Sequence, residues 1–83
     1  MKVTIRFFSS LREQLGISHQ EHETQALSVG QLRSELMLLQ PVFAQALASG
    51  KAIRVAVNQE VCDDMALLSE GCEVAFFPPV TGG

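Results

Sequence analysis

The chain has 83 residues, of which 47% are hydrophobic and 18% are charged, and its formal net charge at pH 7 is −3. This composition is typical of one small packed domain and argues against a disordered chain. Six basic residues against nine acidic ones argue against a nucleic-acid-binding surface, and no apolar run approaches the roughly 20 residues that cross a bilayer. We therefore expect a soluble cytoplasmic protein with no nucleic-acid or membrane partner.

The first predicted strand covers residues 2–8 and alternates in polarity. Val3, Ile5 and Phe7 share the face that we expect to pack into the core, so Phe8 falls on the opposite face as a candidate contact residue. A short helix follows, and we expect Ser10 to be its N-cap in a capping box.

Residues 17–25 form a polar stretch that we interpret as a second, exposed strand. His19 and His22 could hold a metal if they lay on a helix, but this stretch lacks an apolar stripe of helical period. We therefore predict a strand or loop here and no metal site.

The main helix is predicted over residues 28–40. Ser28 and Gln31 have the spacing of a capping box, and Pro41 is placed to begin a second, short helix that Gly50 ends. The apolar stripe of the main helix consists of Val29, Leu32, Leu36 and Leu39.

The C-terminal part of the chain is predicted to contain three strands, near residues 53–57, 60–62 and 73–77. In the last of these, Val74 and Phe76 share one face and Phe77 lies on the other. The order of the elements predicts an α+β domain in which one main helix packs on one face of a mixed sheet. Phe8 and Phe77 would then lie on the uncovered face and form a docking patch.

The two cysteines, Cys62 and Cys72, match neither a zinc-binding nor a CxxC spacing. We interpret them as reduced thiols that act as small apolar side chains. A redox role is disfavoured because no basic neighbour in the sequence lowers the pKa of either thiol.

Residues 78–83 follow the last strand as a tail, whereas residues 1–77 make up the folded domain. Pro78 and Pro79 favour extended backbone, and Gly82 has no Cβ, so the backbone can pass through a narrow slot. Six extended residues span at most about 20 Å. The carboxylate of Gly83 is a poor electrophile, but it becomes a good acyl centre once a leaving group such as AMP is attached. Our hypothesis is that Gly83 carries the function and that other proteins supply the catalysis.

Three segments of the chain carry a resemblance to a known family. They are Phe7-Phe8 with Leu11-Arg12-Glu13, Val57-Asn58-Gln59, and the final stretch from Gly71 through Phe-Phe-Pro-Pro-Val-Thr to Gly83. In this order they resemble the small subunit of molybdopterin synthase, over essentially the whole chain. The resemblance implies a ubiquitin-like β-grasp fold in which the first and last strands lie side by side.

The resemblance also implies a chemistry. An adenylating enzyme related to ubiquitin-activating enzymes would use Mg-ATP to convert the Gly83 carboxylate into an acyl-adenylate, and sulfur would then replace AMP to give a thiocarboxylate. The tail would enter the large catalytic subunit of molybdopterin synthase, in a heterotetramer, and donate sulfur to cyclic pyranopterin monophosphate. The chain itself would bind no cofactor or metal. Residues expected to act at the tail or to contact the partner are Gly83, Gly82, Phe8, Arg12, Phe77, Pro78, Pro79, Val80 and Thr81.

Cys72 stands where many relatives have Asp, which puts the stability of the preceding turn in doubt. Three alternatives stay open at this point. The chain could be a thiamine-type sulfur carrier, a ubiquitin-like modifier conjugated to lysines, or a stand-alone enzyme with Cys62 or Cys72 as its nucleophile.

Overall fold

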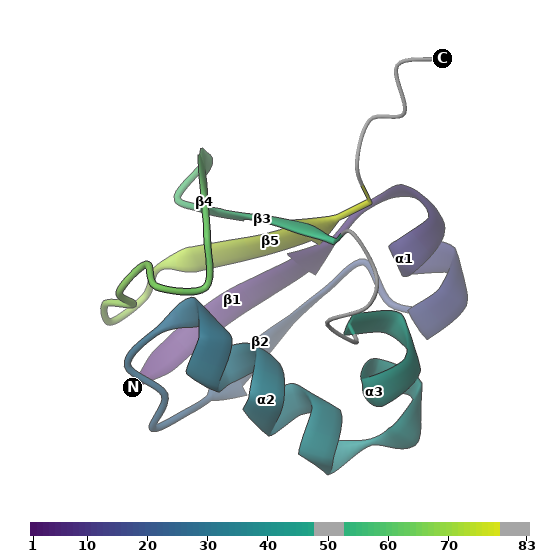
Figure 1. The fold of residues 1–83 in the computed structure, drawn as a ribbon, viewed down its shortest axis with the longest axis horizontal. Helices are drawn as coiled ribbons and strands as arrows, with labels where there is room; N and C mark the ends of the chain where they lie inside the picture. The colour runs from purple at the N-terminus through teal and green to yellow at the C-terminus, as the bar shows by residue number, and fades with distance from the viewer. Residues whose placement is uncertain (48–52, 79–83) are drawn as a thin grey trace.

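The computed structural model of the chain describes residues 1–47 and 53–78. Within those ranges the chain forms strands and helices in the predicted order (Figure 1). The elements are β1 (Lys2–Phe7), α1 (Ser9–Leu15), β2 (His19–Glu23), α2 (Val29–Leu39), α3 (Pro41–Leu47), β3 (Arg54–Val57), β4 (Glu60–Cys62) and β5 (Glu73–Phe77). None of these helices is long and apolar enough to cross a membrane.

The strands form one mixed sheet in the order β2-β1-β5-β3-β4. The first and last strands are neighbours and run parallel, with Ile5 opposite Val74, while every other pair is antiparallel. On its other side β5 pairs with β3, where Val55 lies opposite Phe76. The last strand therefore occupies the centre of the sheet, and the predicted α+β architecture with a mixed sheet is confirmed.

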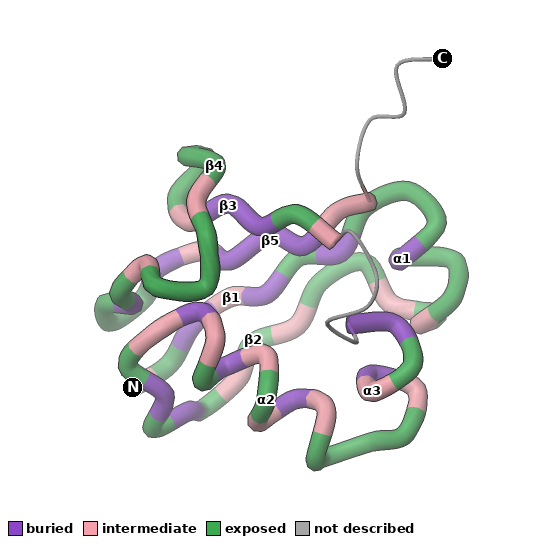
Figure 2. Tube along the Cα trace, viewed as in Figure 1, coloured by how far each residue is buried: buried purple, intermediate pink, exposed green. Residues whose placement is uncertain are grey.

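The core lies between one face of the sheet and the helices α2 and α3, which cover that face (Figures 1 and 2). Alternating residues of β1 and β5 point into it and are fully buried, as predicted. The ring of Phe7 stacks between Phe43 and Phe76, with centroid distances of 5.8 and 6.1 Å. The largest fully buried side chains are Phe7, Phe76, Ile5, Leu32, Leu36, Leu47, Val3, Val29, Val55 and Val74. We refer to this side of the sheet as the covered face and to the other side as the open face.

The start of α1 differs from the prediction. The helix begins at Ser9, its N-cap is Phe8 with extended backbone, and no side chain caps it, so the expected capping box on Ser10 is wrong. The strand β1 runs directly into the turn, and Ser9 adopts a positive φ of 54° to make it. The helix ends at Gly16, whose φ of 77° lies in the left-handed region that glycine tolerates best.

The N-terminus of α2 is capped as predicted. The Ser28 hydroxyl accepts a hydrogen bond from the Gln31 amide at 3.3 Å, and the Gln31 side chain returns to the amide of Leu27 at 2.7 Å. The expected stripe is wrong at its last member, because Leu39 is 58% exposed. Beyond it Gln40, which precedes Pro41, is extended and turns the chain toward α3. The predicted stop at Gly50 lies outside the described residues.

The polar strand β2 forms one edge of the sheet, as predicted, and it is tied to α2 by side chains. His22 Nε2 lies 3.2 Å from Glu35 Oε1, and the hydroxyl of the buried Thr24 donates to the other oxygen of the same carboxylate. That hydroxyl also accepts from the Ala26 amide at 2.9 Å. These bonds satisfy a polar group that would otherwise be buried without a partner. Among the described residues no cluster of three metal-ligating side chains occurs.

Candidate functional site

The predicted tail leaves the sheet from its centre. The strand β5 ends at Phe77, and Pro78 follows half-buried, whereas Pro79, Val80, Thr81, Gly82 and Gly83 lie outside the described residues. Neighbours hold the end of β5 from both sides, because the Phe8 amide donates to the Phe76 carbonyl at 3.2 Å and Arg54 of β3 pairs with Phe77. The point from which the tail departs is thus fixed by ladder hydrogen bonds rather than by a loop.

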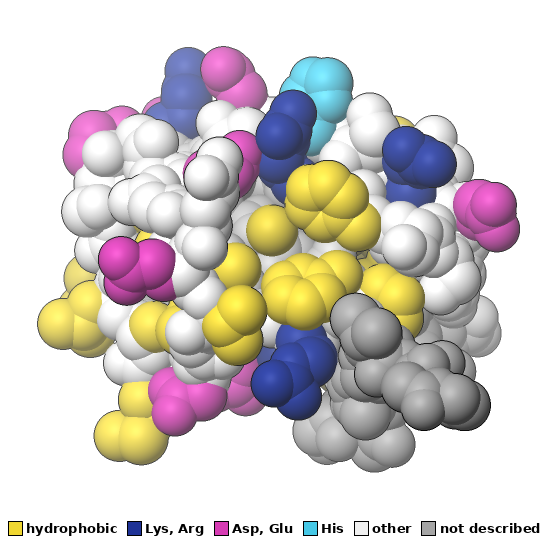
Figure 3. Space-filling model, turned by 90° about the horizontal axis from the view of Figure 1, so that it is seen from above, with side chains coloured by type: hydrophobic (Ala, Val, Ile, Leu, Met, Phe, Trp, Pro, Cys, Tyr) yellow, Lys and Arg dark blue, Asp and Glu magenta, His cyan; other side chains and the backbone are white. Residues whose placement is uncertain are grey.

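The open face carries an apolar area beside this point. Phe8 is 41% exposed and Phe77 is half-buried, and both lie on the side of the sheet away from the helices, as predicted. Ala75 pairs with Ala56, so the row of residues next to Phe77 on this face contains two small side chains. Val61 lies opposite Ala56 on β4 and is 63% exposed. We call this set, Phe8, Ala56, Val61, Ala75 and Phe77, the open-face patch, and Figure 3 shows hydrophobic side chains gathered on this face.

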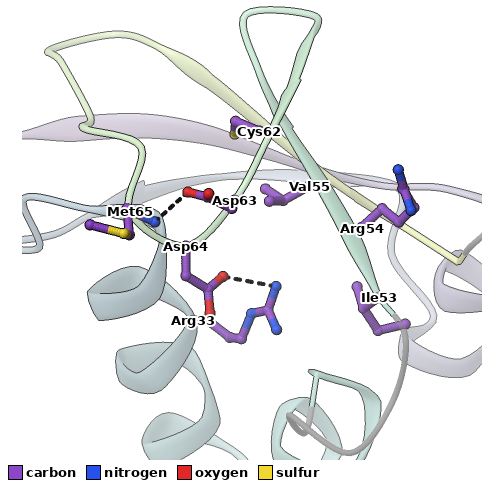
Figure 4. A pocket seen from close by; sticks show the side chains of 8 residues that line it. All are labelled: Arg33, Ile53, Arg54, Val55, Cys62, Asp63, Asp64 and Met65. Atoms are coloured by element: carbon purple, nitrogen blue, oxygen red, sulfur yellow. Dashed lines mark hydrogen bonds and ion pairs between the residues drawn. The ribbon is translucent and has the colours of Figure 1, made fainter.

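Arginines lie around the open-face patch. Arg6 faces Ala75 across the β1–β5 pair, and its guanidinium lies 3.5 Å from the Glu73 carboxylate. Arg54 is exposed, and Figure 4 shows its side chain directed away from α2. An apolar centre with a charged rim is the usual anatomy of a protein-docking surface.

Below β3 and β4, on the helix side, lies a cleft of about 590 Å³ (Figure 4). The Arg33 guanidinium enters it from α2, forms an ion pair with Asp64 at 3.1 Å, and lies over the ring of Phe76 at 5.8 Å from the ring centroid. Its buried Nε has no hydrogen-bond partner within the described residues. Arg33 thereby fastens α2 to the central strand and to the chain that follows β4.

Neither cysteine is built as a nucleophile. Cys72 is buried in the core, and Cys62 is half-buried at the wall of the cleft. Burial raises the pKa of the Cys62 thiol most, a backbone hydrogen bond with Val57 partly opposes this, and the nearby carboxylates of Asp63, Asp64 and Glu60 raise it further. A thiol of raised pKa forms less thiolate at neutral pH and reacts more slowly. The sequence prediction that both thiols are reduced, apolar fillers agrees with these positions.

A family model described as "ThiS family" matches residues 5–83. The chain belongs to the ThiS family. It is 38% identical to the molybdopterin synthase sulfur carrier subunit of Escherichia coli (strain K12) over 81 residues, which cover 98% of this chain and 99% of the relative. It is 35% identical to the protein of the same name from Haemophilus influenzae, with the same coverage.

Two solved structures show that the ThiS-family chain shares a ubiquitin-like β-grasp fold. The small archaeal modifier protein 1 of H. volcanii superposes with a TM-score of 0.75 at 25% identity, over 95% of this chain and 98% of that one. The complex of subunits 1 and 2 of the molybdopterin-converting factor from Helicobacter pylori contains a similar fold, with a TM-score of 0.70 at 24% identity and full coverage of both chains. The β-grasp prediction is confirmed.

The structure brings some of the predicted site residues of the ThiS-family chain together. Phe8, Phe77 and Pro78 lie at one end of the sheet, where β5 stops. Arg12 is exposed on α1, and no contact described in the structure links it to the phenylalanines. The turn before Cys72 is intact, since the Cys72 amide donates to the Ser69 carbonyl at 3.1 Å, and the thiol itself fills a place in the core.

Sequence reasoning missed Val61 as a member of the open-face patch and Arg54 as a charged residue beside it. The place of Arg54 depends on the pairing of β3 with β5, and that of Val61 on the β3–β4 hairpin, which turns at Asn58 and Gln59 with positive φ at both residues. A two-residue turn of this kind sets the register and therefore the face on which each side chain of β4 lies. The Asn-Gln pair between two short apolar runs was the available signal.

Proposed function

We propose that this ThiS-family chain is the sulfur-carrier subunit of a molybdopterin synthase and that it carries sulfur as a thiocarboxylate on Gly83. The single observation that supports this most is the similarity of the whole chain, at 38% and 35% identity, to two proteins named molybdopterin synthase sulfur carrier subunit. The Gly-Gly end supplies an unhindered acyl group, and activation requires ATP, Mg²⁺ and a separate adenylating enzyme. The chain itself contributes the acyl carbon and the surface that delivers it.

The partner that takes the sulfur is, in this proposal, a large catalytic subunit with which the chain forms a heterotetramer. A relative in fold was solved as a complex of subunits 1 and 2 of the molybdopterin-converting factor, which supports a large-subunit partner. The open-face patch is the apolar surface for that contact, and Phe8, Phe77 and Val80 are its proposed anchors, with Arg12 at the rim. Pro78, Pro79 and Thr81 lead the tail into the partner, and extended prolines lower the entropy lost when it is ordered.

Gly82 has a steric role in the proposal. Because the acyl group must pass a narrow entrance, a Cβ at this position obstructs insertion while leaving the sheet untouched. The thiocarboxylate of Gly83 then reaches the substrate, cyclic pyranopterin monophosphate, inside the large subunit. Two such deliveries complete the dithiolene of molybdopterin.

Intact-mass spectrometry tests the proposal. The chain is incubated with the adenylating enzyme, Mg-ATP and a sulfur source, and the expected product is heavier by the exchange of one oxygen for sulfur, mapped to the C-terminal peptide. A persulfide on Cys62 would instead add a whole sulfur atom that a reductant removes, so the Cys62→Ser variant serves as the matched control. Retention of the shift in a chain without Gly82 and Gly83 contradicts the proposal.

A modifier role is the second candidate, because the fold also matches the small archaeal modifier protein 1 at 25% identity. A modifier forms isopeptide bonds between its terminal glycine and lysines of other proteins. Adducts of this kind in cell lysate, with no free thiocarboxylate, would favour the modifier. Binding to a thiazole synthase, and not to the large subunit, would favour a thiamine-type carrier.

A further inference from the structure

We propose that β4 and the chain that follows it form a second docking surface, which receives a basic surface with apolar side chains on the large subunit. We call this surface the β4 ledge and define it as Glu60, Asp63, Met65 and Leu67. The inference rests on the proposed function, because it extends the contact with the same partner beyond the tail and the open-face patch.

The first argument is the exposure of large apolar side chains in this segment. Met65 is 83% exposed and Leu67 is 76% exposed. Beside Leu67 lies an open hollow of about 310 Å³, whose lining combines the apolar side chains of Val57, Val61 and Ala66 with the polar ones of Asn58 and Glu60. Contiguous exposed apolar side chains of this kind mark interaction surfaces more often than single ones do.

The second argument is that hydrogen bonds hold the backbone of the β4 ledge in place, so that Met65 and Leu67 are exposed in an ordered segment. The Met65 amide donates to Asp63 Oδ1 at 2.8 Å, and the first amides of α2 donate to carbonyls of the same segment, Val29 to Ala66 at 3.0 Å and Gly30 to Asp64 at 2.8 Å. A Cβ at Gly30 would lie only 3.1 Å from the Cβ of Asp64, so helix and ledge are in close contact. A surface that is ordered before binding loses little entropy when a partner docks.

The third argument is charge. The described residues from 55 onward contain no lysine, arginine or histidine, whereas they contain five of the nine acidic residues of the chain: Glu60, Asp63, Asp64, Glu70 and Glu73. Arg33 and Arg6 neutralise Asp64 and Glu73, but Glu60 and Asp63 have no ion-pair partner within the described residues. Acidic side chains therefore flank Met65 and Leu67, which fits a partner whose apolar groups lie among lysines or arginines.

The fourth argument is continuity with the open-face patch. Val61, which belongs to that patch, and Glu60 point to opposite faces of β4, but β4 is the edge strand of the sheet, and Val61, Glu60 and Leu67 line the same hollow at that edge. The molecule measures 37 × 26 × 21 Å along its principal axes. A standard protein interface covers about 800 Å² per partner, or a patch roughly 28 Å across. A large subunit that covers the open-face patch and extends around the edge at β4 therefore reaches the β4 ledge.

The test measures the Kd of the large subunit for three double variants of the full chain, by titration calorimetry. Met65→Ser with Leu67→Ser removes the apolar contact, and we expect the Kd to rise about tenfold. Glu60→Gln with Asp63→Asn removes the charge while keeping the acceptor for the Met65 amide, and we expect a Kd more than twofold higher at low salt that depends less on the salt concentration. The control, Leu38→Ser with Leu39→Ser, makes the same chemical change on α2, and we expect no change in Kd.

The outcomes separate the two proposals. If the unaltered chain binds the large subunit and both ledge variants bind it with a Kd within twofold of that of the unaltered chain, the β4 ledge is overturned and the proposed function stays intact. The same variants are titrated with the adenylating enzyme. If they bind only this enzyme more weakly, and the large subunit as the unaltered chain does, the choice of partner is overturned. Failure of the unaltered chain to bind the large subunit overturns the proposed function itself. Equal thermal unfolding midpoints for all variants, expected because the altered side chains are exposed, show that the fold is unchanged.

Discussion

Two Phe-Phe pairs, Phe7-Phe8 at the end of β1 and Phe76-Phe77 at the end of β5, each place one ring on either side of the sheet. On the covered face Phe7 and Phe76 are 1% and 0% exposed. On the open face Phe8 is 41% exposed and Phe77 is half-buried. One residue type therefore stabilises the fold on the covered face and, in our proposal, binds a partner on the open face. The difference arises solely from which face the helices cover.

The largest effect is expected for Phe76→Ala. This change removes a fully buried ring that contacts Phe7 and lies beneath the Arg33 guanidinium. We expect the free energy of unfolding to fall by about 3–5 kcal/mol, measured by urea denaturation. Phe77→Ala, one residue away on the open face, is the matched control and should lower it by less than about 1 kcal/mol. Similar losses in the two variants would remove the distinction between the faces.

The converse experiment changes Phe8 to Ala. Because Phe8 is partly exposed and lies in the open-face patch, we expect little change in the unfolding midpoint but a rise in the Kd for the large subunit of tenfold or more, equivalent to about 1.4 kcal/mol or more. Surface plasmon resonance with the immobilised large subunit measures it. Leu38→Ala on α2, 89% exposed in the unaltered chain, is the control. Unchanged affinity in the Phe8 variant would show that the open face is not the docking surface.

The polar edge of the covered face gives a third effect, which is smaller than that of Phe76→Ala. Thr24→Val keeps the shape of the side chain but removes the hydroxyl that donates to Glu35 and accepts from the Ala26 amide. We expect a loss of about 1–3 kcal/mol in the free energy of unfolding, because that amide is left without its partner. Thr24→Ser retains the hydroxyl and should lose less. A larger loss for Thr24→Ser than for Thr24→Val would mean that the methyl group matters more here than the hydrogen bonds.

The smallest effect is expected for Arg6→Gln on the open face. The ion pair with Glu73 is 3.5 Å long, and the Arg6 side chain is 47% exposed. Exposed pairs of this kind contribute about 0.2–1 kcal/mol, and salt screens them. A double-mutant cycle with Glu73→Gln, repeated at high salt, measures the coupling. A coupling well above that range would make the rim of the open face a stabilising feature, contrary to the comparison.

Much of the fold could be predicted because its strongest signals are local. Alternation in β1 and β5 gave the covered and open faces correctly, and Ser28, Pro41 and Gly16 marked helix ends where the structure has them. The ends that were wrong depend on neighbouring elements. Ser10 loses its expected N-cap role because β1 enters α1 through Ser9 at positive φ, and Leu39 leaves the core because the chain turns before Pro41.

The candidate site was predictable only in part, because it depends on contacts between distant segments. Phe8 and Phe77 follow from alternation, but their closeness requires the parallel pairing of β1 with β5, which the family resemblance supplied and local pattern could not. The contact of Arg33 with Phe76 and Asp64 joins α2, β5 and the chain after β4, so no short window of sequence contains it. The predicted roles of Pro79, Val80, Thr81, Gly82 and Gly83 stay predictions, since these residues lie outside the described ranges.

The place of β5 in the sheet has a mechanical consequence. The chain leaves the domain from a strand that is paired on both sides, with β1 along Glu73–Phe76 and with β3 along Val74–Phe77. A pull along this strand acts on two ladders of hydrogen bonds in shear, so many bonds share the load instead of opening one after another. A domain whose last strand is paired in this way can bear a force applied at that strand without unfolding.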